Sequence, residues 1–392
     1  MNVVILTFSG IPTTDYCLPL VDRLQKDKVI QNIFLLSNSL NSKNIFNQFE
    51  DSRQIMSSMN VTNIDLGTYS VMKHINSIFR FSPRSATGNK FYVKLLKKLE
   101  RFLIKNLNMT IRTLKKINPD VVFFDHRKPE SIDNYGKIFE YLIENKIKVY
   151  LTPHAPHYLQ PKEHLSTDLD KNLTNKIIYL DPFEFSTLNK DLTNLYKDII
   201  CTSYPGFEDH WLDRINKLAK YENSLVVMLR PFHTDSSKWN KDEKVVLQKN
   251  ELTEIIDCIN KISRKNNFEN IIVKPHPKNY TEDLEKYFLP LINHPNITLY
   301  GDSIYNLVSK NNQFISTYST TALVSIANQS PTYIINTEIF SKIFHDWTTL
   351  SDLYSKFSGF TTSEEILNCK IDTDLDKQHL KKFFKKQNYE IF

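Results

Sequence analysis

An apolar strand runs directly into a rigid polar turn at residues 270–278, which read NIIVKPHPK. Proline stands on both sides of His276, and a proline ring fixes the backbone torsion φ, so the imidazole is held where the strand ends. Lys274 and Lys278 flank the histidine, and a hydrogen-bond donor beside two positive charges suits a phosphate group. The alternative is an ordinary strand-exit turn with a solvent-facing histidine.

A second apolar strand ends in a run of hydroxyl side chains at residues 313–321, which read QFISTYSTT, and a helix pattern follows. Ser319 is a good N-cap candidate. The N–H groups of a helix's first turn, the helix dipole and nearby hydroxyls form an anion site that needs no glycine. The alternative is a helix start with more capping residues than it needs. The candidate phosphate ligands of the two motifs are Lys274, His276, Pro277, Ser316, Thr317, Ser319, Thr320 and Thr321.

The same alternation of short apolar strands and longer amphipathic stretches continues in both directions from these motifs. The strand patterns lie at residues 3–8, 33–37, 121–124, 149–152, 177–180, 199–202, 225–229, 270–274, 297–300, 313–316 and 332–335. The helix patterns include residues 18–26, 91–117, 132–145, 210–219, 251–266, 281–292 and 320–327. Strands that alternate with helical crossovers form parallel sheets flanked by helices, so the sequence predicts an α/β fold.

These strands are too numerous for one sheet, and we expect two α/β domains, each with its own parallel sheet. The predicted domains are 1–210 and 211–374, and residues 375–392 form a basic C-terminal tail whose return to the first domain is left open. Ligands of such folds bind at the carboxyl ends of the strands. The turns that follow each strand are therefore the places to search for function.

Two turns of the first domain carry candidate catalytic groups. Residues 150–157 read YLTPHAPH, and prolines again brace the histidine His154. A neutral imidazole titrates near pH ~6.5, which suits proton abstraction from a hydroxyl. Residues 123–128 read FFDHRK, and Asp125 is either a general base or the cap of the next turn. For His154 the alternative is a structural histidine bonded to the backbone.

The second domain offers one more candidate. Arg230, in the sequence LRPFH that follows the strand at 225–229, is a charge partner for a diphosphate or a carboxylate.

The composition excludes several kinds of site. The chain has 392 residues but only 7 glycines, and it contains neither a glycine-rich phosphate loop nor a glycine-rich dinucleotide turn. The 4 cysteines are far apart and form no metal-ligand pair with each other or with histidine. The net charge of +6 is too small and too dispersed to indicate a nucleic-acid partner. A mild positive charge instead suits an anionic ligand or an anionic membrane surface.

The sequence indicates a cytoplasmic protein. Its first residues, MNVVILTFSGIP, read as a strand and not as a signal peptide, and no apolar run is long enough to span a membrane. Residues 90–116 and 380–386 are basic and amphipathic. They are either solvated helices or contacts with an anionic inner membrane or a lipid-linked acceptor, which would make the protein peripheral on the inner membrane.

The order of these motifs resembles bacterial transferases with the GT-B architecture, over roughly residues 149–335. The resemblance implies a GT-B-like fold, with two Rossmann-like domains whose parallel sheets face each other across a cleft. His276-Pro277 and the hydroxyl run 316–321 look like the HP and serine/threonine motifs of sialyltransferases, polysialyltransferases and capsular Kdo transferases. In those enzymes the two motifs bind the CMP leaving group. The order of the turns at 152–156, 229–231, 274–277 and 317–320 is also similar to the CDP-glycerol glycerophosphotransferases of teichoic acid synthesis.

The resemblance implies a glycosyltransferase that moves an acidic sugar, such as sialic acid, a related nonulosonate or Kdo, from a CMP-activated donor. The acceptor would be a hydroxyl of a surface glycan or glycolipid, as in capsule or lipooligosaccharide biosynthesis. The first domain would be the acceptor side and the second would hold the donor. The reaction would need no metal ion and no cofactor, since His276, the lysines and a helix N-terminus supply the positive charge.

Two departures from these families bear on the catalytic base. The acidic motif of the sialyltransferases is absent, and Asp125 is the substitute candidate. The teichoic acid enzymes have a tryptophan before and a glycine after the histidine that matches His154, where this chain has Pro153 and Ala155. The base therefore stays open between Asp125 and His154. A CDP-alditol phosphotransferase, a UDP-sugar 2-epimerase of the same architecture and a non-catalytic polysaccharide-binding protein are the alternative functions.

Overall fold

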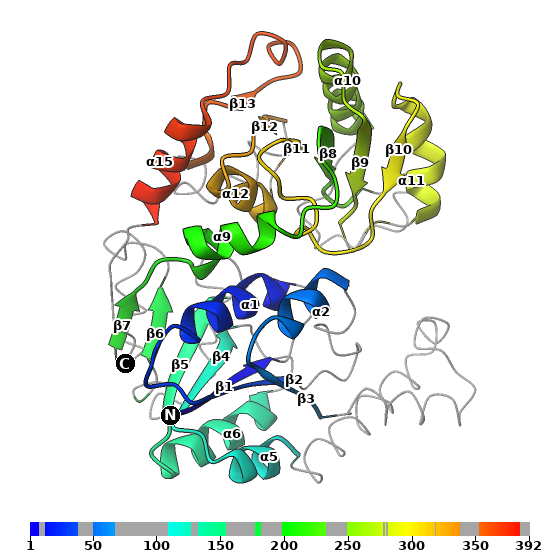
Figure 1. Cartoon of the computed structure of the whole chain (residues 1–392). Helices are drawn as coiled ribbons and strands as arrows, with labels where there is room; N and C mark the ends of the chain where they lie inside the picture. The colour runs from blue at the N-terminus through cyan, green and yellow to red at the C-terminus, as the bar shows by residue number, and fades with distance from the viewer. Residues whose placement is uncertain are drawn as a thin grey trace, which may run out of the picture. The chain divides into compact units, whose positions relative to one another are not determined.

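A computed structural model of the chain divides into two compact units, unit 1 (Met1–Pro205 with Gln387–Phe392) and unit 2 (Gly206–Lys386) (Figure 1). Each unit is described by itself. The structure describes residues 1–7, 12–37, 50–66, 109–126, 132–153, 176, 178–181, 198–232, 249–276, 279, 281–317, 319–337 and 353–384.

The described part of unit 1 contains a parallel sheet in the order β3-β2-β1-β4-β5-β6-β7. Its strands are β1 (Asn2–Thr7), β2 (Asn32–Ser37), β3 (Thr62–Asp65), β4 (Val121–His126), β5 (Lys148–Pro153), β6 (Ile178–Asp181) and β7 (Asp198–Cys201). The central strands β1 and β4 are apolar on both faces because helices cover both sides of the sheet.

Four described helices cover the unit 1 sheet: α1 (Pro12–Leu24), α2 (Glu50–Ser57), α5 (Met109–Ile117) and α6 (Ile132–Glu144). Helices α5 and α6 pack on one face, where Leu114 and Leu142 join a core with Val4, Val122 and Val149 from the strands. Helices α1 and α2 lie on the opposite face (Figure 1).

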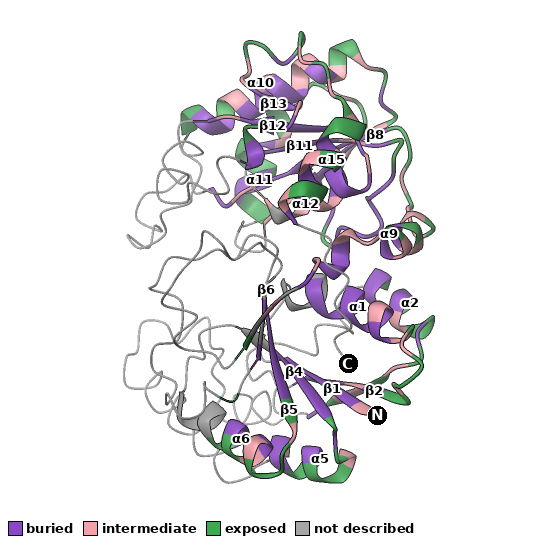
Figure 2. Cartoon of the chain, turned by 90° about the vertical axis from the view of Figure 1, so that its left-hand side faces the viewer, coloured by how far each residue is buried: buried purple, intermediate pink, exposed green. Residues whose placement is uncertain are grey.

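The described part of unit 2 contains a second parallel sheet, in the order β10-β9-β8-β11-β12-β13. Its strands are β8 (Ser224–Met228), β9 (Asn270–Lys274), β10 (Ile297–Leu299), β11 (Gln313–Ser316), β12 (Thr332–Ile335) and β13 (Phe360–Thr361). The central strands are buried, as Figure 2 shows.

The described helices of unit 2 are α9 (Asp209–Asn216), α10 (Lys249–Lys265), α11 (Thr281–Tyr287), α12 (Thr320–Ala327) and α15 (Thr373–Phe383), with the short 3₁₀ turn η7 (Leu289–Leu291). A second 3₁₀ turn, η5 (Pro205–Phe207), begins at the last residue of unit 1. Helices α10 and α11 cover one face, where Ile259 and Leu284 share a core with Leu225, Val273 and Ile315. Because crossovers between parallel strands are almost always right-handed, the reversal of strand order at β11 puts α12, which joins β11 to β12, on the other face.

Both sheets have the strand order 3-2-1-4-5-6 of the Rossmann fold, followed in unit 1 by one more strand. The predicted fold class, α/β with two Rossmann-like domains and parallel sheets, is therefore confirmed. In each sheet the chain changes direction beside its first strand, between β1 and β4 in unit 1 and between β8 and β11 in unit 2. Ligands of open α/β sheets bind outside the carboxyl ends of the strands at this switch point.

Some local predictions were wrong. Residues 281–292 do not form one helix: α11 ends at Tyr287, and Pro290 lies in the separate turn η7 because proline cannot continue a helix. Helix α2 was not among the predicted helices. Of the predicted helix 91–117, the described residues are those of α5.

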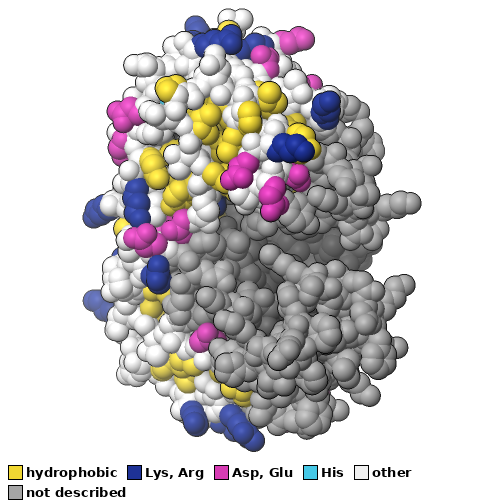
Figure 3. All heavy atoms as spheres, turned by 90° about the vertical axis from the view of Figure 1, so that its right-hand side faces the viewer, with side chains coloured by type: hydrophobic (Ala, Val, Ile, Leu, Met, Phe, Trp, Pro, Cys, Tyr) yellow, Lys and Arg dark blue, Asp and Glu magenta, His cyan; other side chains and the backbone are white. Residues whose placement is uncertain are grey.

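Apolar side chains gather on the surface of unit 2 beside α11 and the edge strand β10 (Figure 3). Tyr287 and Leu291 are 37% and 57% exposed. Leu289, Ile297 and Leu299 are partly buried and pack against the core of unit 2. Basic and acidic side chains are interspersed on the described part of this face (Figure 3).

In the described part of the chain, no helix combines the length and the apolarity that crossing a membrane requires.

Candidate functional site

The carboxyl ends of three neighbouring strands bring the predicted phosphate motifs of unit 2 to one edge of the sheet. Strand β8 lies between β9 and β11, with Met228 in register with both Lys274 and Ser316. Neighbouring strands are about 4.8 Å apart, so the backbones of Lys274 and Ser316 are separated by about 10 Å. The turns with Arg230 and His276 and the hydroxyl run therefore leave the sheet side by side.

Helix α12 begins at this edge, and Ser319 is its N-cap, as predicted. Ser319 has extended backbone torsions, and its hydroxyl accepts a hydrogen bond of 3.2 Å from the backbone N–H of Thr321. The positive end of the helix dipole and the N–H groups of the first turn point out of the edge of the sheet. For Thr320 the structure describes the backbone and not the side chain.

Two buried hydroxyls lie between β11 and the helix start. Ser316 is 1% exposed and Thr317 is 4% exposed, and within the described part of the chain neither Ser316 Oγ nor Thr317 Oγ1 has a hydrogen-bond partner. A buried hydroxyl without a partner costs about 1–3 kcal/mol of desolvation free energy. Buried polar groups in folded proteins are generally satisfied. We therefore interpret this pair as hydroxyls that form hydrogen bonds with a ligand or an ordered water.

A tyrosine far along the chain supports the helix start. The fully buried phenol of Tyr354 donates a 3.1 Å hydrogen bond to the carbonyl of Ser319. Burial raises the pKa of Tyr354, and the positive charge of Arg230 acts in the opposite direction. The guanidinium of Arg230 is thus near enough to Tyr354 to affect its pKa, so a positive charge lies in the region where α12 begins.

The histidine turn is tied to the arginine turn by Asn279. The backbone N–H of Asn279 donates to the carbonyl of His276 over 2.8 Å. Its side-chain amide donates to the carbonyl of Arg230 over 3.2 Å and accepts from the N–H of Phe232 over 3.0 Å. His276 itself is half-buried, and Pro277 lies outside the described residues.

Lys274, at the end of β9, contacts the turn that follows the neighbouring strand β10. Its ammonium donates a hydrogen bond to the backbone carbonyl of Asp302 and lies 6.0 Å from the centre of the Tyr300 ring. Its charge still lies at the carboxyl end of β9, next to the histidine turn.

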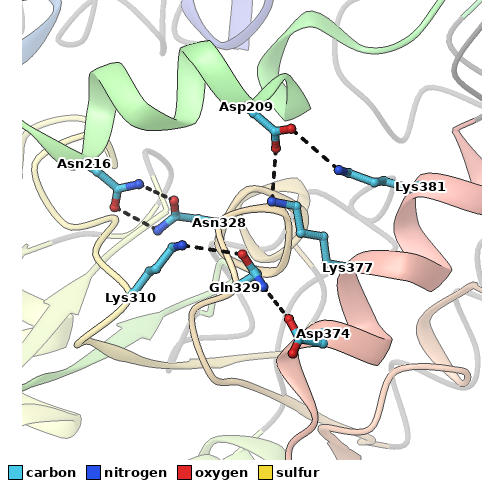
Figure 4. A network of polar contacts seen from close by, with 8 residues as sticks. All are labelled: Asp209, Asn216, Lys310, Asn328, Gln329, Asp374, Lys377 and Lys381. Carbon is cyan, nitrogen blue, oxygen red and sulfur yellow. Dashed lines mark hydrogen bonds and ion pairs between the residues drawn. The ribbon is translucent and has the colours of Figure 1, made fainter.

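A polar network holds the opposite end of α12 (Figure 4). Asn328, the C-cap of α12, exchanges two hydrogen bonds with Asn216 of α9, of 2.6 and 3.0 Å. Asp209 of the same helix pairs with Lys377 of α15 over 3.1 Å and with Lys381 over 3.7 Å. Helix α12 is therefore fixed at both ends, by Tyr354 and by Asn216.

The candidate bases belong to unit 1. Asp125 lies at the carboxyl end of β4, in register with Thr152 of β5, and its side chain is not among those described. His154 lies outside the described residues. Thr7 ends the first strand β1, is 1% exposed, and its hydroxyl has no hydrogen-bond partner in the described part of the chain.

Within the residues that the structure describes, no group of three or more histidine, cysteine, aspartate or glutamate side chains is arranged to hold a metal ion.

Asn279 and Tyr354 were not predicted as site residues. An asparagine three positions after a turn histidine does not mark a site residue, because asparagine is common in turns for several reasons. Nothing in the sequence around Tyr354 links it to Ser319.

The sequence matches no family model and no curated protein. Several solved structures share the fold. MnaA of S. aureus, in a structure with UDP, is 11% identical with a TM-score of 0.52, over 98% of this chain and 92% of that chain. A Listeria monocytogenes protein that has been proposed to be a UDP-N-acetylglucosamine 2-epimerase is 13% identical with a TM-score of 0.50, over 99% and 91%.

A plant protein gives a similar result. UGT2 of Phytolacca americana, in complex with UDP-2-fluoro-glucose and pterostilbene, is 11% identical with a TM-score of 0.50, over 97% of this chain and 93% of that chain. At these identities the similarity shows the fold, which is of the GT-B type.

Proposed function

We propose that the chain is a glycosyltransferase of the GT-B type that takes a sugar from a pyrimidine-nucleotide donor, with the donor phosphate bound at the carboxyl edge of unit 2. The observation that carries this proposal is the pair of buried hydroxyls, Ser316 and Thr317, beside the capped start of α12. Hydroxyls, helix N–H groups and a nearby guanidinium are groups that recognise a phosphate.

The chemistry follows from the charge that develops on the donor. When the bond between the sugar's anomeric carbon and the phosphate oxygen breaks, the electron pair stays on the phosphate. Arg230, His276 and the start of α12 are the groups we propose to stabilise that charge, and one such donor typically contributes 10²–10³-fold in rate. A base in unit 1, Asp125 or His154, would take the proton of the acceptor hydroxyl.

Two donors have support. MnaA and UGT2, which share the fold, were solved with UDP and with a UDP-sugar. The HP and serine/threonine motifs instead favour CMP and an acidic sugar. Both nucleotides present a pyrimidine and an anionic phosphate, so the same edge of the sheet would bind either one.

A UDP-sugar 2-epimerase is the second candidate function. It is favoured by the similarity of the fold to the Listeria monocytogenes protein. An epimerase converts its nucleotide sugar without an acceptor, whereas a transferase releases the nucleotide only when an acceptor is present.

The acceptor we propose is a hydroxyl of a glycan or glycolipid, with capsule or lipooligosaccharide as the product class and the cytoplasmic face of the inner membrane as the location. The support is the basic character of residues 90–116 and 380–386. Co-sedimentation with anionic vesicles at low salt, lost at high salt, is the expected result. Equal recovery with neutral vesicles would contradict the membrane contact.

The test of function has two steps. Thermal unfolding with UDP, CMP and CDP identifies the nucleotide, because a ligand that binds only the folded protein raises the melting temperature. Mass spectrometry then follows the matching nucleotide sugars with and without glycan acceptors. Nucleotide release that requires an acceptor supports the transferase, and acceptor-independent conversion of the sugar supports the epimerase. No stabilisation by any of the three nucleotides would contradict both.

A further inference from the structure

The side chain of Asn279 bridges the two turns that carry Arg230 and His276. Its Nδ2 donates to the carbonyl of Arg230 over 3.2 Å, and its Oδ1 accepts from the backbone N–H of Phe232 over 3.0 Å. The backbone of Asn279 is held in turn by the 2.8 Å bond to the carbonyl of His276. One residue therefore contacts the backbone of both turns.

This bridge continues the pairing of β8 and β9 beyond the ends of the strands. The N–H of Leu229 donates to the carbonyl of Lys274 over 3.0 Å. The next residues on each side leave the sheet, and the carboxamide of Asn279 then supplies one donor and one acceptor, as a neighbouring strand would. The relative position of the two turns is thereby fixed by a side chain.

Pro231 explains why the carboxamide of Asn279 contacts Arg230 and Phe232, the two neighbours of the proline. Proline has no N–H to donate, and its ring fixes φ. Asn279 accordingly accepts from Phe232 and donates to Arg230. Phe232 is buried and packs at 6.2 Å, between ring centres, on Phe288. The turn is thus held by the core at Phe232 and by Asn279 at Arg230.

We propose that Asn279 is a positioning residue of the phosphate site, which sets the place of Arg230 relative to His276. This inference rests on the proposed function. A phosphate bound by both groups needs a fixed separation between them, and a misplacement of about 1 Å from a distant change can cost as much as 10²-fold. Asn279 makes its contacts with the protein and acts on the ligand through Arg230.

Asn260 provides a matched control in the same unit. Its Nδ2 donates to the carbonyl of Leu291 over 3.0 Å, and its Oδ1 accepts from the N–H of Asn293 over 2.7 Å. Asn260 therefore forms the same two bonds as Asn279: it donates to one backbone carbonyl and accepts from the backbone N–H two residues later. Leu291 and Asn293 precede strand β10, so this bridge lies toward the amino ends of the strands. Loss of either bridge removes equivalent bonds, but Asn279 alone touches the arginine turn.

The test is a double-mutant cycle on nucleotide affinity, measured by calorimetric titration of UDP and of CMP into the full chain. The variants are Asn279→Ala, Arg230→Ala and their combination, with Asn260→Ala alone and combined with Arg230→Ala. We expect Asn279→Ala to weaken the better nucleotide about tenfold and Asn260→Ala to change it less than twofold. Because Asn279 acts through Arg230, the combined variant should bind within twofold of Arg230→Ala alone.

Two results would overturn the inference: affinity of Asn279→Ala within twofold of wild type, or losses for Asn279→Ala and Arg230→Ala that multiply. Circular dichroism and thermal unfolding establish that each variant is folded. If Asn279→Ala does not fold, Asn279→Gln is measured in the same cycle, since its longer amide keeps the polarity but displaces the turn. Wild-type protein that binds neither nucleotide would overturn the proposed function together with this inference, whereas tight wild-type binding unaffected by Asn279 would overturn the inference alone.

Discussion

Tyr354 donates a 3.1 Å hydrogen bond to the carbonyl of Ser319, although the two residues are 35 positions apart in the chain. The phenol is fully buried, and the residue it contacts is the N-cap of α12. The bond therefore links the segment before β13 to the helix start that we propose as the phosphate site. The effect of this hydrogen bond on the site can be measured by removing the phenol hydroxyl.

Tyr354→Phe should destabilise the protein and weaken its nucleotide complex. The substitution leaves the carbonyl of Ser319 without this donor, and an unmade buried hydrogen bond costs about 1 kcal/mol or somewhat more. Denaturation in urea measures the free energy of unfolding, and titration measures the affinity. An unchanged free energy of unfolding would contradict the support of α12 by the phenol.

His276→Ala should reduce turnover about 10²–10³-fold while the protein stays folded, since it removes one charge-stabilising donor from the leaving group. The matched control is His294→Ala. The ring of His294 lies 3.0 Å from the carbonyl of Asn296, just before strand β10, and 3.2 Å from the carbonyl of Phe268, just before strand β9. His294→Ala should lower the melting temperature and leave turnover within a few-fold of wild type. Near wild-type turnover of His276→Ala would show that His276 does not stabilise the leaving group.

The amide pair of Asn216 and Asn328 should behave as a unit. Replacing Asn216 by alanine removes the donor to Asn328 Oδ1, while Asn328 Nδ2 keeps its 3.2 Å bond to the hydroxyl of Ser330. The expected loss is about 1–3 kcal/mol in the free energy of unfolding. The combination of Asn216→Ala with Asn328→Ala should cost less than the sum of the two single losses. Additive losses in urea denaturation would show that the two side chains do not interact.

Asp376 should make the stability of unit 2 depend on pH in a defined direction. Its side chain is 2% exposed and accepts bonds from the N–H and hydroxyl of Ser358, of 2.6 and 2.8 Å. Burial raises the pKa of Asp376 above its ordinary value of 3.8 in spite of these bonds. Between 3.8 and the raised pKa the folded chain binds more protons than the unfolded chain, so stability rises as the pH falls through that window.

The measurement compares wild type with Asp376→Asn at pH 7 and at about pH 4.5. The unfolding free energy of wild type minus that of the variant should be larger at about pH 4.5 than at pH 7, because asparagine does not titrate. A shift in favour of the variant would mean that the pKa is lowered and not raised.

The strands that carry this site were readable from the sequence because they are short, β-branched and buried on both faces. The bounds of α12, Thr320–Ala327, agree with the pattern because Ser319 caps its first turn and Asn328 ends it. Strand β3 was not predicted, since Thr62–Asp65 reads TNID, lies at the sheet edge and is nowhere buried. Strand β13 has only two residues, Phe360–Thr361.

The site was predictable only where it follows a strand directly. Ser316 ends β11 and Thr317 follows it directly, so the strand pattern located them. Asn279 and Tyr354 act across loops, through bonds to backbone atoms that any residue type provides. Such contacts leave no periodic trace in a single sequence, and they became visible only with the fold.

Ser316→Ala and Thr317→Val together should make the ligand-free protein more stable. Each substitution removes a buried hydroxyl that has no partner in the described part of the chain, and valine keeps the shape of threonine. We expect a gain of about 1 kcal/mol in the free energy of unfolding, because the desolvation cost of the hydroxyls disappears. A loss of stability would mean that these hydroxyls are satisfied within the protein.

The titration of UDP and CMP into wild type and into this double variant tests the central claim most directly. The account predicts that wild type binds one of the two nucleotides and that the more stable double variant binds it at least tenfold more weakly. Equal affinity of the two proteins for that nucleotide would contradict a phosphate site at the end of β11.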